Sequence, residues 1–252
     1  MGSFLLIALA LLLFLFLGVL AFISWGVRWG SSREEYEAKL PGDDYFAGGP
    51  PAYVAMTRAI TIQAPPEIVW PWVAQMGRGA GFYSYDFLDN GRRMSAKHIV
   101  SWIPEPRVGD LSVIGILRHL IPNKELSWWV PGVKFLGAIC RMAIFIQVRP
   151  GDDGSRLLVR ISADASGIFG RPVLWVFRFM VSIMARKQLL NIKFRAEKFG
   201  ARTLNPERPE TGARDQYQYC EAIFQSGERA GVKGKGEAEQ FKDPQSDYNM
   251  DH

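Results

Sequence analysis

The first feature of the chain is an apolar run from Phe4 to Val27, with no charge before Arg28. A helix needs about 20 apolar residues to cross a bilayer core, so this run can span one. Trp25 and Trp29 stand where an interfacial aromatic belt is expected. A cleaved signal peptide would show a basic start, a shorter apolar run and a small-x-small site. We therefore predict a retained single-pass membrane anchor, and Arg28 and Arg33 favour a cytoplasmic soluble domain.

Alternating apolar and polar positions predict strands farther along the chain. Residues 57–62 form one such run, and two prolines end it before an amphipathic helix over residues 66–76. Three more strands are predicted over residues 133–140, 141–149 and 156–163. A Pro-Gly-Asp-Asp-Gly sequence joins the last two of these strands, and such residues are typical of the turn of a β-hairpin. The sheet is therefore predicted to be antiparallel.

A long helix is predicted after these strands. Residues 171–199 contain no proline after Pro172 and no glycine, so about seven helical turns are allowed. Large apolar residues recur at intervals of three and four and predict one buried stripe: Val173, Val176, Met180, Ile183, Leu190 and Phe194. The second half of the helix is rich in Lys and Arg. This charge indicates either a solvated face or attraction to anionic lipid headgroups.

The stretch from Thr57 to Asn90, TRAITIQAPPEIVWPWVAQMGRGAGFYSYDFLDN, resembles a family signature. It is similar to that of the START-like SRPBCC superfamily, which includes polyketide cyclases and lipid-transport-like proteins. Shorter matches extend the resemblance over most of the chain: LPGDD from Leu40, VGD from Val108, RLLVR from Arg156 and RKQLLNIKFRAEKFG from Arg186. The resemblance implies an α+β helix-grip fold. In that fold a curved antiparallel sheet wraps a long C-terminal helix and leaves a deep apolar cavity.

Composition divides the chain into four parts. Residues 1–29 are the predicted transmembrane anchor, and residues 30–52, polar and then rich in proline and glycine, are a predicted linker. Residues 53–204 form the predicted START-like domain. Residues 205–252 are a predicted disordered polar tail, because they carry few aliphatic side chains. The net charge of +5 is mild, and two widely separated cysteines predict no disulfide framework.

The chain carries few signals of catalysis or cofactor binding. Its three histidines are scattered, so no metal site is predicted. The glycines after residue 76 follow a helix rather than a strand, and neither a cofactor nor a nucleic-acid partner is predicted. Weak candidates for acid–base chemistry are Tyr85, Asp86 and His98. In the competing interpretation, Tyr83 and Tyr85 pack at a cavity rim and Asp86 caps a short helix from Phe87.

Nine residues are predicted to line a ligand cavity: Val73, Met76, Phe82, Tyr83, Trp102, Ile144, Phe177, Met180 and Met184. They favour a membrane-anchored carrier or sensor of an apolar small molecule or lipid, with membrane lipids as further partners. An enzyme of the polyketide cyclase type is an alternative, which a polar group buried opposite Asp86 would favour. Another is an accessory or scaffold subunit that holds a membrane-protein partner through residues 115–136. Within that segment, residues 115–132 are apolar but broken by prolines, so the pattern assigns no element.

Overall fold

The computed structural model describes residues 2–46, 53–135, 137–200 and 203–204, and the predicted tail over residues 205–252 lies outside them. The elements follow in this order: α1 (Gly2–Val27), α2 (Arg33–Glu37), η1 (Asp43–Phe46), β1 (Tyr53–Ile62), α3 (Pro66–Gln75), α4 (Asp86–Asp89), β2 (Ile99–Val100), β3 (Leu111–Ser112), β4 (Gly115–Ile121), β5 (Glu125–Phe135), β6 (Ala138–Gly151), β7 (Gly154–Ser166), α5 (Gly170–Phe199) and β8 (Thr203–Leu204).

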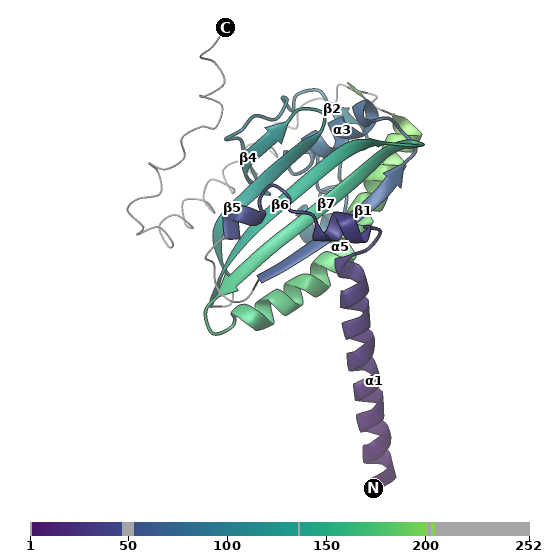
Figure 1. Cartoon of the computed structure of the whole chain (residues 1–252), viewed down its shortest axis with the longest axis vertical. Coiled ribbons are helices and arrows are strands. Elements are labelled where there is room, and N and C mark those ends of the chain that lie inside the picture. Colours follow the sequence, from purple (N-terminus) through teal and green to yellow (C-terminus); the bar gives the residue numbers. More distant parts are fainter. Residues whose placement is uncertain (1, 47–52, 136, 201–202, 205–252) are drawn as a thin grey trace, which may run out of the picture.

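The centre of the molecule is a six-stranded sheet that curves around the long helix α5 (Figure 1). Its strands are ordered β1-β7-β6-β5-β4-β3, and every neighbouring pair is antiparallel. A separate pair, β2 and β8, is parallel and two residues long in each strand. This arrangement confirms the predicted α+β helix-grip fold.

Most of the predicted strands are confirmed. The run over residues 57–62 lies in β1, the edge strand beside β7. Residues 141–149 and 156–163 lie in β6 and β7, and the predicted hairpin turn joins them. The strand predicted over residues 133–140 is wrong. This run contains the end of β5, a turn at Gly137 and the start of β6, and apolar side chains on both sides hide the turn.

The proline-broken segment forms β4 and most of β5. Its two prolines lie where a sheet tolerates a residue without a backbone N–H. Pro122 is in the turn between the two strands, and Pro131 lies at a register shift between Val130 and Val133. A proline at an irregularity removes no regular ladder hydrogen bond, so both strands persist.

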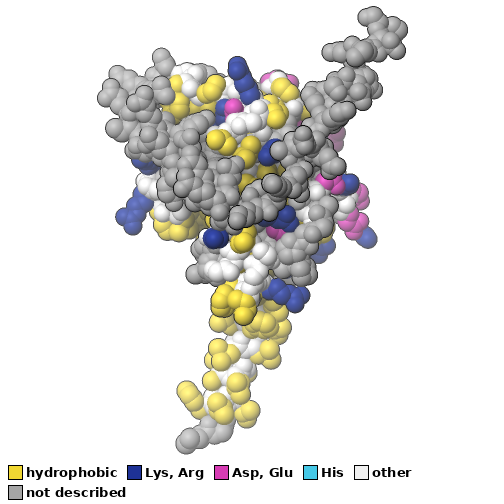
Figure 2. Space-filling view, turned by 90° about the vertical axis from the view of Figure 1, so that its left-hand side faces the viewer, with side chains coloured by type: hydrophobic (Ala, Val, Ile, Leu, Met, Phe, Trp, Pro, Cys, Tyr) yellow, Lys and Arg dark blue, Asp and Glu magenta, His cyan; other side chains and the backbone are white. Residues whose placement is uncertain are grey.

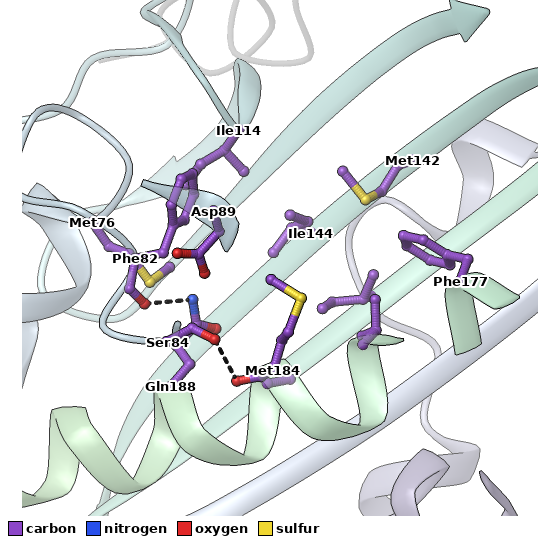
Figure 3. Close-up of a pocket in the computed structure, with 13 residues that line it drawn as sticks. Met76, Phe82, Ser84, Asp89, Ile114, Met142, Ile144, Phe177, Met184 and Gln188 are labelled. Carbon is purple, nitrogen blue, oxygen red and sulfur yellow. Dashed lines mark hydrogen bonds between the residues drawn. The ribbon is translucent and has the colours of Figure 1, made fainter. Parts of the chain in front are cut away.

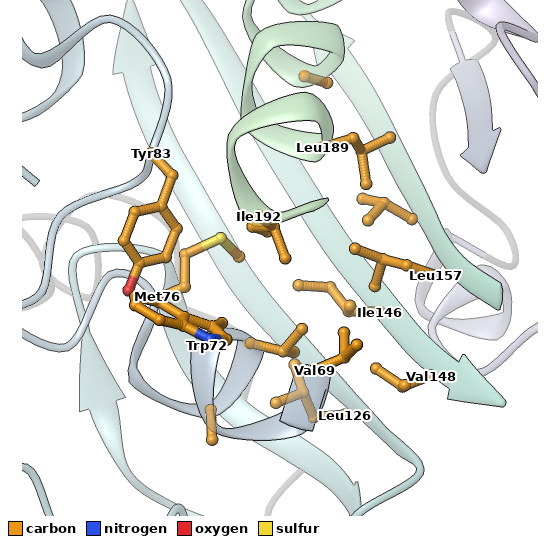
Figure 4. Close-up of a cluster of buried hydrophobic side chains, with 14 of the residues drawn as sticks. Val69, Trp72, Met76, Tyr83, Leu126, Ile146, Val148, Leu157, Leu189 and Ile192 are labelled. Carbon is orange, nitrogen blue, oxygen red and sulfur yellow. The ribbon is translucent and has the colours of Figure 1, made fainter. Parts of the chain in front are cut away.

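The hydrophobic core lies between the sheet, α3 and the second half of α5 (Figure 4). Val69 and Trp72 of α3 are fully buried and share this core with Ile146 of β6 and Leu189 of α5. A buried Val, Leu or Ile side chain contributes about 1.5–3 kcal/mol. The Trp72 indole N–H donates to the Gly200 carbonyl oxygen at 3.1 Å, so burial leaves this polar atom satisfied.

The predicted length of α5 is confirmed, but its predicted buried stripe is wrong apart from Val173, which is buried. Val176, Met180 and Phe194 are 56%, 37% and 51% exposed. The face against the sheet carries other residues, several of them small: Leu174, Ser182, Ala185, Leu189, Ile192 and Ala196. Small side chains allow the helix backbone to approach the sheet at close-packed density. Residue size, and not hydrophobicity alone, therefore sets the buried face.

Part of the predicted linker, residues 30–46, is packed on the sheet, and we call it the outer strap. Glu35 of α2 is 7% exposed and its carboxylate lies 2.8 Å from the Arg156 guanidinium of β7. The Arg160 guanidinium donates to the Asp43 carboxylate at 2.7 Å. The strap thus covers the outer face of β7 while the core covers the inner one. Composition alone predicts a loose connection because these partners are distant in sequence.

Among the described residues, α1 is the helix long and apolar enough to cross a membrane. It projects from the domain with exposed hydrophobic side chains, and Lys and Arg side chains lie where it meets the domain (Figures 1 and 2). Only its last turns are covered, at Ile23 and Val27. They pack on α5, where the ring centroids of Phe22 and Phe179 are 5.7 Å apart.

Close packing of α1 on α5 depends on Gly26. A Cβ atom there would lie 2.5 Å from the Ser182 Cβ atom, whereas one at Gly18 meets no described atom within 4 Å. We expect Gly26→Ala to destabilise the detergent-solubilised protein by about 1–3 kcal/mol through overpacking. The matched control, Gly18→Ala, is expected to leave stability unchanged. Thermal unfolding followed by circular dichroism checks this, and equal melting temperatures for the two variants would contradict it.

Candidate functional site

A pocket of about 160 Å³ lies between α5, the facing strands β6 and β7, and the segment that follows α3 (Figure 3). It is open on one side, and its walls are mainly apolar. The lining residues are Met76, Phe82, Ser84, Asp89, Ile114, Met142, Ile144, Ile161, Phe177, Val181, Met184, Ala185 and Gln188.

Helix and strand periodicity bring the apolar side chains together. On α5, Phe177, Val181 and Met184 recur at intervals of four and three and face the pocket. On β6, Met142 and Ile144 are two residues apart and point to the same side of the sheet. The regular elements thus supply an apolar wall on two sides.

One end of the pocket is polar, with Ser84, Asp89 and Gln188 gathered there (Figure 3). The Ser84 hydroxyl donates to the Met184 carbonyl oxygen at 3.1 Å. The Gln188 side-chain amide donates to the Phe82 carbonyl oxygen at 2.9 Å. Both bonds join α5 to the segment after α3, so they fix the shape of this end.

Asp89, the last residue of α4, is the ionisable group of this pocket. Its Oδ1 atom is buried without a hydrogen-bond partner among the described residues. Burial raises the pKa of the Asp89 carboxyl, and the neighbouring Ser84 hydroxyl offsets part of that rise. Within the described residues, no group of three or more His, Cys, Asp or Glu side chains is placed to hold a metal ion. The free oxygen is therefore available to a ligand, as an acceptor or, when protonated, as a donor.

Five of the nine predicted cavity residues line this pocket: Met76, Phe82, Ile144, Phe177 and Met184. Two of the others lie on regular elements but outside it. Val73 is fully buried in the core around α3. Met180 lies on the outer side of α5, because the buried face of this helix differs from the predicted one.

Tyr83 and Trp102 were predicted to line the cavity and instead support the segment after α3. The backbone of Tyr83 is left-handed, with φ of 58°, and its side chain lies in the core. Gln75 donates to the Tyr83 hydroxyl at 2.7 Å, and burial raises the pKa of this phenol. Trp102 packs over Gly79, where a Cβ atom would lie 2.8 Å from the indole ring.

The three weak catalytic candidates are not brought together. Asp86 begins α4 and accepts hydrogen bonds from the backbone N–H and the hydroxyl of Ser95, so it anchors a loop. Its predicted capping role is wrong, since Tyr85 is the N-cap residue. The Lys187 ammonium lies 4.0 Å from the centroid of the Tyr85 ring, and His98 packs beside the end of α5. Among the described residues, no hydrogen bond joins these three side chains.

Ser84, Asp89 and Gln188 are candidates that the sequence pattern did not indicate. Gln188 could have been found, since it follows Met184 by four residues and shares its helical face. Ser84 and Asp89 lie after a run of glycines with positive φ, Ser84 directly after the left-handed Tyr83 and Asp89 at the end of the short helix α4. No periodicity predicts where such a segment points.

No family model and no curated protein matches this chain. Several solved structures align with it at low identity. A protein from Mesorhizobium loti aligns over 57% of this chain and 98% of its own, at 15% identity and a TM-score of 0.35. A polyketide cyclase-like protein from Corynebacterium glutamicum aligns over 57% and 91%, at 14% identity and 0.34. A protein of the dynemicin biosynthetic locus aligns over 57% of this chain and 48% of its own, at 17% identity and 0.35.

These alignments are too weak to assign a function. The architecture itself defines the class, an α+β helix-grip protein with an apolar pocket under its long helix.

Proposed function

We propose that this protein binds an apolar small molecule, or the apolar part of a lipid, in the pocket while α1 anchors it in a membrane. The pocket carries the proposal, because an apolar wall ends in a polar group of Ser84, Asp89 and Gln188. Such a site binds by removing apolar ligand surface from water, which contributes about 25 cal/mol per Å². A few polar groups then fix the orientation of the ligand.

The size of the pocket limits what it holds. An apolar cavity of about 150 Å³ in another protein binds benzene, whereas drug-sized ligands occupy roughly 300–1,000 Å³. At about 160 Å³, the pocket accommodates one ring or the end of an acyl chain. A longer ligand extends through the open side.

The composition and packing of α1 support the membrane part of the proposal. The most apolar 18 residues within Ser3–Val27 have a mean hydropathy of 3.2, well within the range of membrane-spanning helices. A signal peptide is removed from the mature protein, whereas the end of α1, at Ile23 and Gly26, packs against the folded domain. Arg28 and Arg33 follow the helix, and we propose that the domain lies on the cytoplasmic side.

Native mass spectrometry of the full chain, released from nanodiscs, tests this function. We expect a mass increment from a co-purified apolar molecule, which organic extraction then identifies. A panel of aromatic rings, alkyl alcohols and fatty acids extends the test to chains that purify empty. If no member of the panel adds mass to the folded chain, the proposal is wrong.

Asp89 is expected to make stability depend on pH. An unfolded aspartate releases its carboxyl proton near pH 3.8. Burial raises the pKa of Asp89, so the folded chain keeps this proton to a higher pH. The free energy of unfolding therefore falls as the pH rises through the raised pKa. We expect Asp89→Asn to raise the melting temperature at about pH 7 by about 2–4 °C, because the variant has no charge to desolvate. The gain is held to roughly 1 kcal/mol because the carboxyl is partly exposed and solvent screens its charge. At about pH 3 the variant and the native chain should melt together. Thermal unfolding checks this with the exposed Asp153→Asn as the control, and an equal gain at both pH values would contradict it.

A second candidate function is acid–base catalysis of the polyketide cyclase type. Asp89 favours it, because a half-buried carboxyl in a pocket, with a raised pKa and one oxygen without a partner among the described residues, is typical of catalytic acids and bases. Asp89→Asn distinguishes the two functions. A binding protein loses affinity for a polar ligand head and has no turnover to lose. An enzyme keeps substrate binding and loses turnover of a polyketide substrate.

A further inference from the structure

An exposed apolar surface covers the start of α5 and the turn before it. Ile168 and Phe169 precede the helix and are 87% and 54% exposed. Trp175, Val176 and Met180 lie on its first turns and are 38%, 56% and 37% exposed. We call these five residues the α5 outer patch. Exposed apolar side chains gathered in this way mark an interaction site.

Within the described part of the chain, every residue of the outer patch keeps more than a third of its surface exposed. The sheet packs on the opposite face of α5, through Leu174 and Ser182. The end of the β5–β6 hairpin lies beside the patch, since a Cβ atom at Gly137 would lie 3.5 Å from the Phe169 ring. Ile139 at that end is 38% exposed. The apolar surface therefore continues from the helix onto the hairpin.

The outer patch lies on the edge of the domain from which α1 leaves. The end of α1 packs on the middle of α5, where the Arg186 guanidinium lies 5.8 Å from the Trp25 ring centroid and 5.3 Å from the Trp29 ring centroid. Phe179 also contacts α1, and Met180 of the patch follows it. Figure 1 shows the first half of α5 running from this junction along the lower edge of the domain, with α1 descending from the same edge.

Basic residues accompany the outer patch along α5. Arg171, Arg178 and Arg186 are distributed over the part of the helix that carries or adjoins the patch. The single acidic residue of the helix, Glu197, lies near its other end. Helices that lie in a membrane interface combine an apolar face with Lys and Arg beside it, and anionic headgroups attract those cations. The charge of this edge therefore suits an anionic lipid surface.

We propose that the α5 outer patch inserts into the headgroup region of the membrane that holds α1. The inference rests on the membrane anchor of the proposed function. Val176 and Met180 lie on the same turns of α5 whose other side presents Phe177 and Val181 to the pocket. Docking of the patch thus brings the pocket within one helix diameter, about 10 Å, of the bilayer.

An environment-sensitive probe on the outer patch tests the docking. The native cysteines of the full chain are replaced by Cys140→Ser and Cys220→Ser, and a new one is introduced by Val176→Cys. This cysteine is labelled with the fluorophore NBD. The labelled protein is placed in nanodiscs of phosphatidylcholine, with or without phosphatidylglycerol. Val108→Cys is the matched control, because Val108 is also an exposed valine, at 62%, and lies just before β3 at the far edge of the sheet. Leu12→Cys in α1 reports on the anchor.

We expect the Val176 probe to emit at shorter wavelength in nanodiscs and to be quenched by spin-labelled lipid, more strongly with phosphatidylglycerol. The Val108 probe is expected to remain solvent-like. A Val176 probe that matches the Val108 probe, while the Leu12 probe is in lipid, overturns the docking and leaves the anchor intact. A Leu12 probe in water overturns both. A Val176 shift that appears in detergent and grows with protein concentration identifies a second copy of the chain as the occupant and also overturns lipid docking.

Discussion

Met184→Trp is expected to weaken binding of an apolar ligand at least about tenfold, whereas Met180→Trp should leave binding unchanged. Met184 lines the pocket, and Met180 lies on the outer side of the same helix. The indole of Met184→Trp fills volume that the ligand needs. Ligand and indole together would overpack the pocket, at a cost of about 1–3 kcal/mol, and 1.4 kcal/mol corresponds to a tenfold change in affinity.

The two variants isolate the pocket because they place the same substitution on the same helix. Circular dichroism first establishes that both are folded. Ligand occupancy is then measured by native mass spectrometry, with the ligand that co-purifies with the native chain. Equal occupancy in the two folded variants would move the binding site away from this pocket.

Glu35→Ala is expected to destabilise the protein by about 2 kcal/mol, a fall of roughly 4–8 °C in melting temperature. The Glu35 carboxylate is nearly buried and pairs with the guanidinium groups of Arg156 and Arg149. It also completes the N-terminal capping box of α2 with Ser32. Removing one partner of a buried ion pair costs about 3–5 kcal/mol. We expect less here because Arg149 is half-exposed and keeps its hydration.

The pH dependence of this loss provides a second check. Hydrogen bonds from Arg156 lower the pKa of Glu35 in the folded protein. Its stabilisation is therefore complete above pH 4.5, the ordinary value, and disappears as the pH falls through the lowered one. The control is Glu37→Ala on the same helix, whose pair with Arg33 is exposed and contributes less than about 1 kcal/mol. Thermal unfolding at several pH values measures the stability of both variants. If Glu35→Ala loses as little stability as Glu37→Ala, the outer strap does not stabilise the fold through Glu35.

Local signals made the fold predictable from the sequence. The hairpin between β6 and β7 combines a Gly/Asp turn with alternating strands, so sequence neighbours determine both its position and its register. The length of α5 follows from a long stretch without proline or glycine after Pro172. The apolar lining at Ile144 and Met184 could be predicted for the same reason, since each residue lies on a regular element.

Features that depend on distant partners were not predictable. The outer strap is fixed by pairs such as Glu35 with Arg156, which lie more than a hundred positions apart and leave no pattern in either segment. The buried face of α5 depends on Ser182 and Ala185, whose small size matters only against the elements that pack on them, which are distant in sequence: α1 at Ser182, and the sheet. Asp89 ends α4, a helix of four residues that is too short to show a periodicity, so neither helix nor strand periodicity could locate it.

The path from α1 to the sheet leaves the domain no free tether. Residues 28–32 alone separate α1 from α2. The Ala59 N–H donates to the Trp29 carbonyl oxygen at 3.2 Å, and the Ser31 hydroxyl donates to the Thr57 carbonyl oxygen at 3.1 Å. A flexible tether of about 20 residues would let a domain range over roughly 25 Å. A domain held by α1 without such slack cannot reach across to an opposing bilayer. If the proposed function holds, any ligand of the domain is exchanged with the membrane that holds α1, or with a carrier that arrives there.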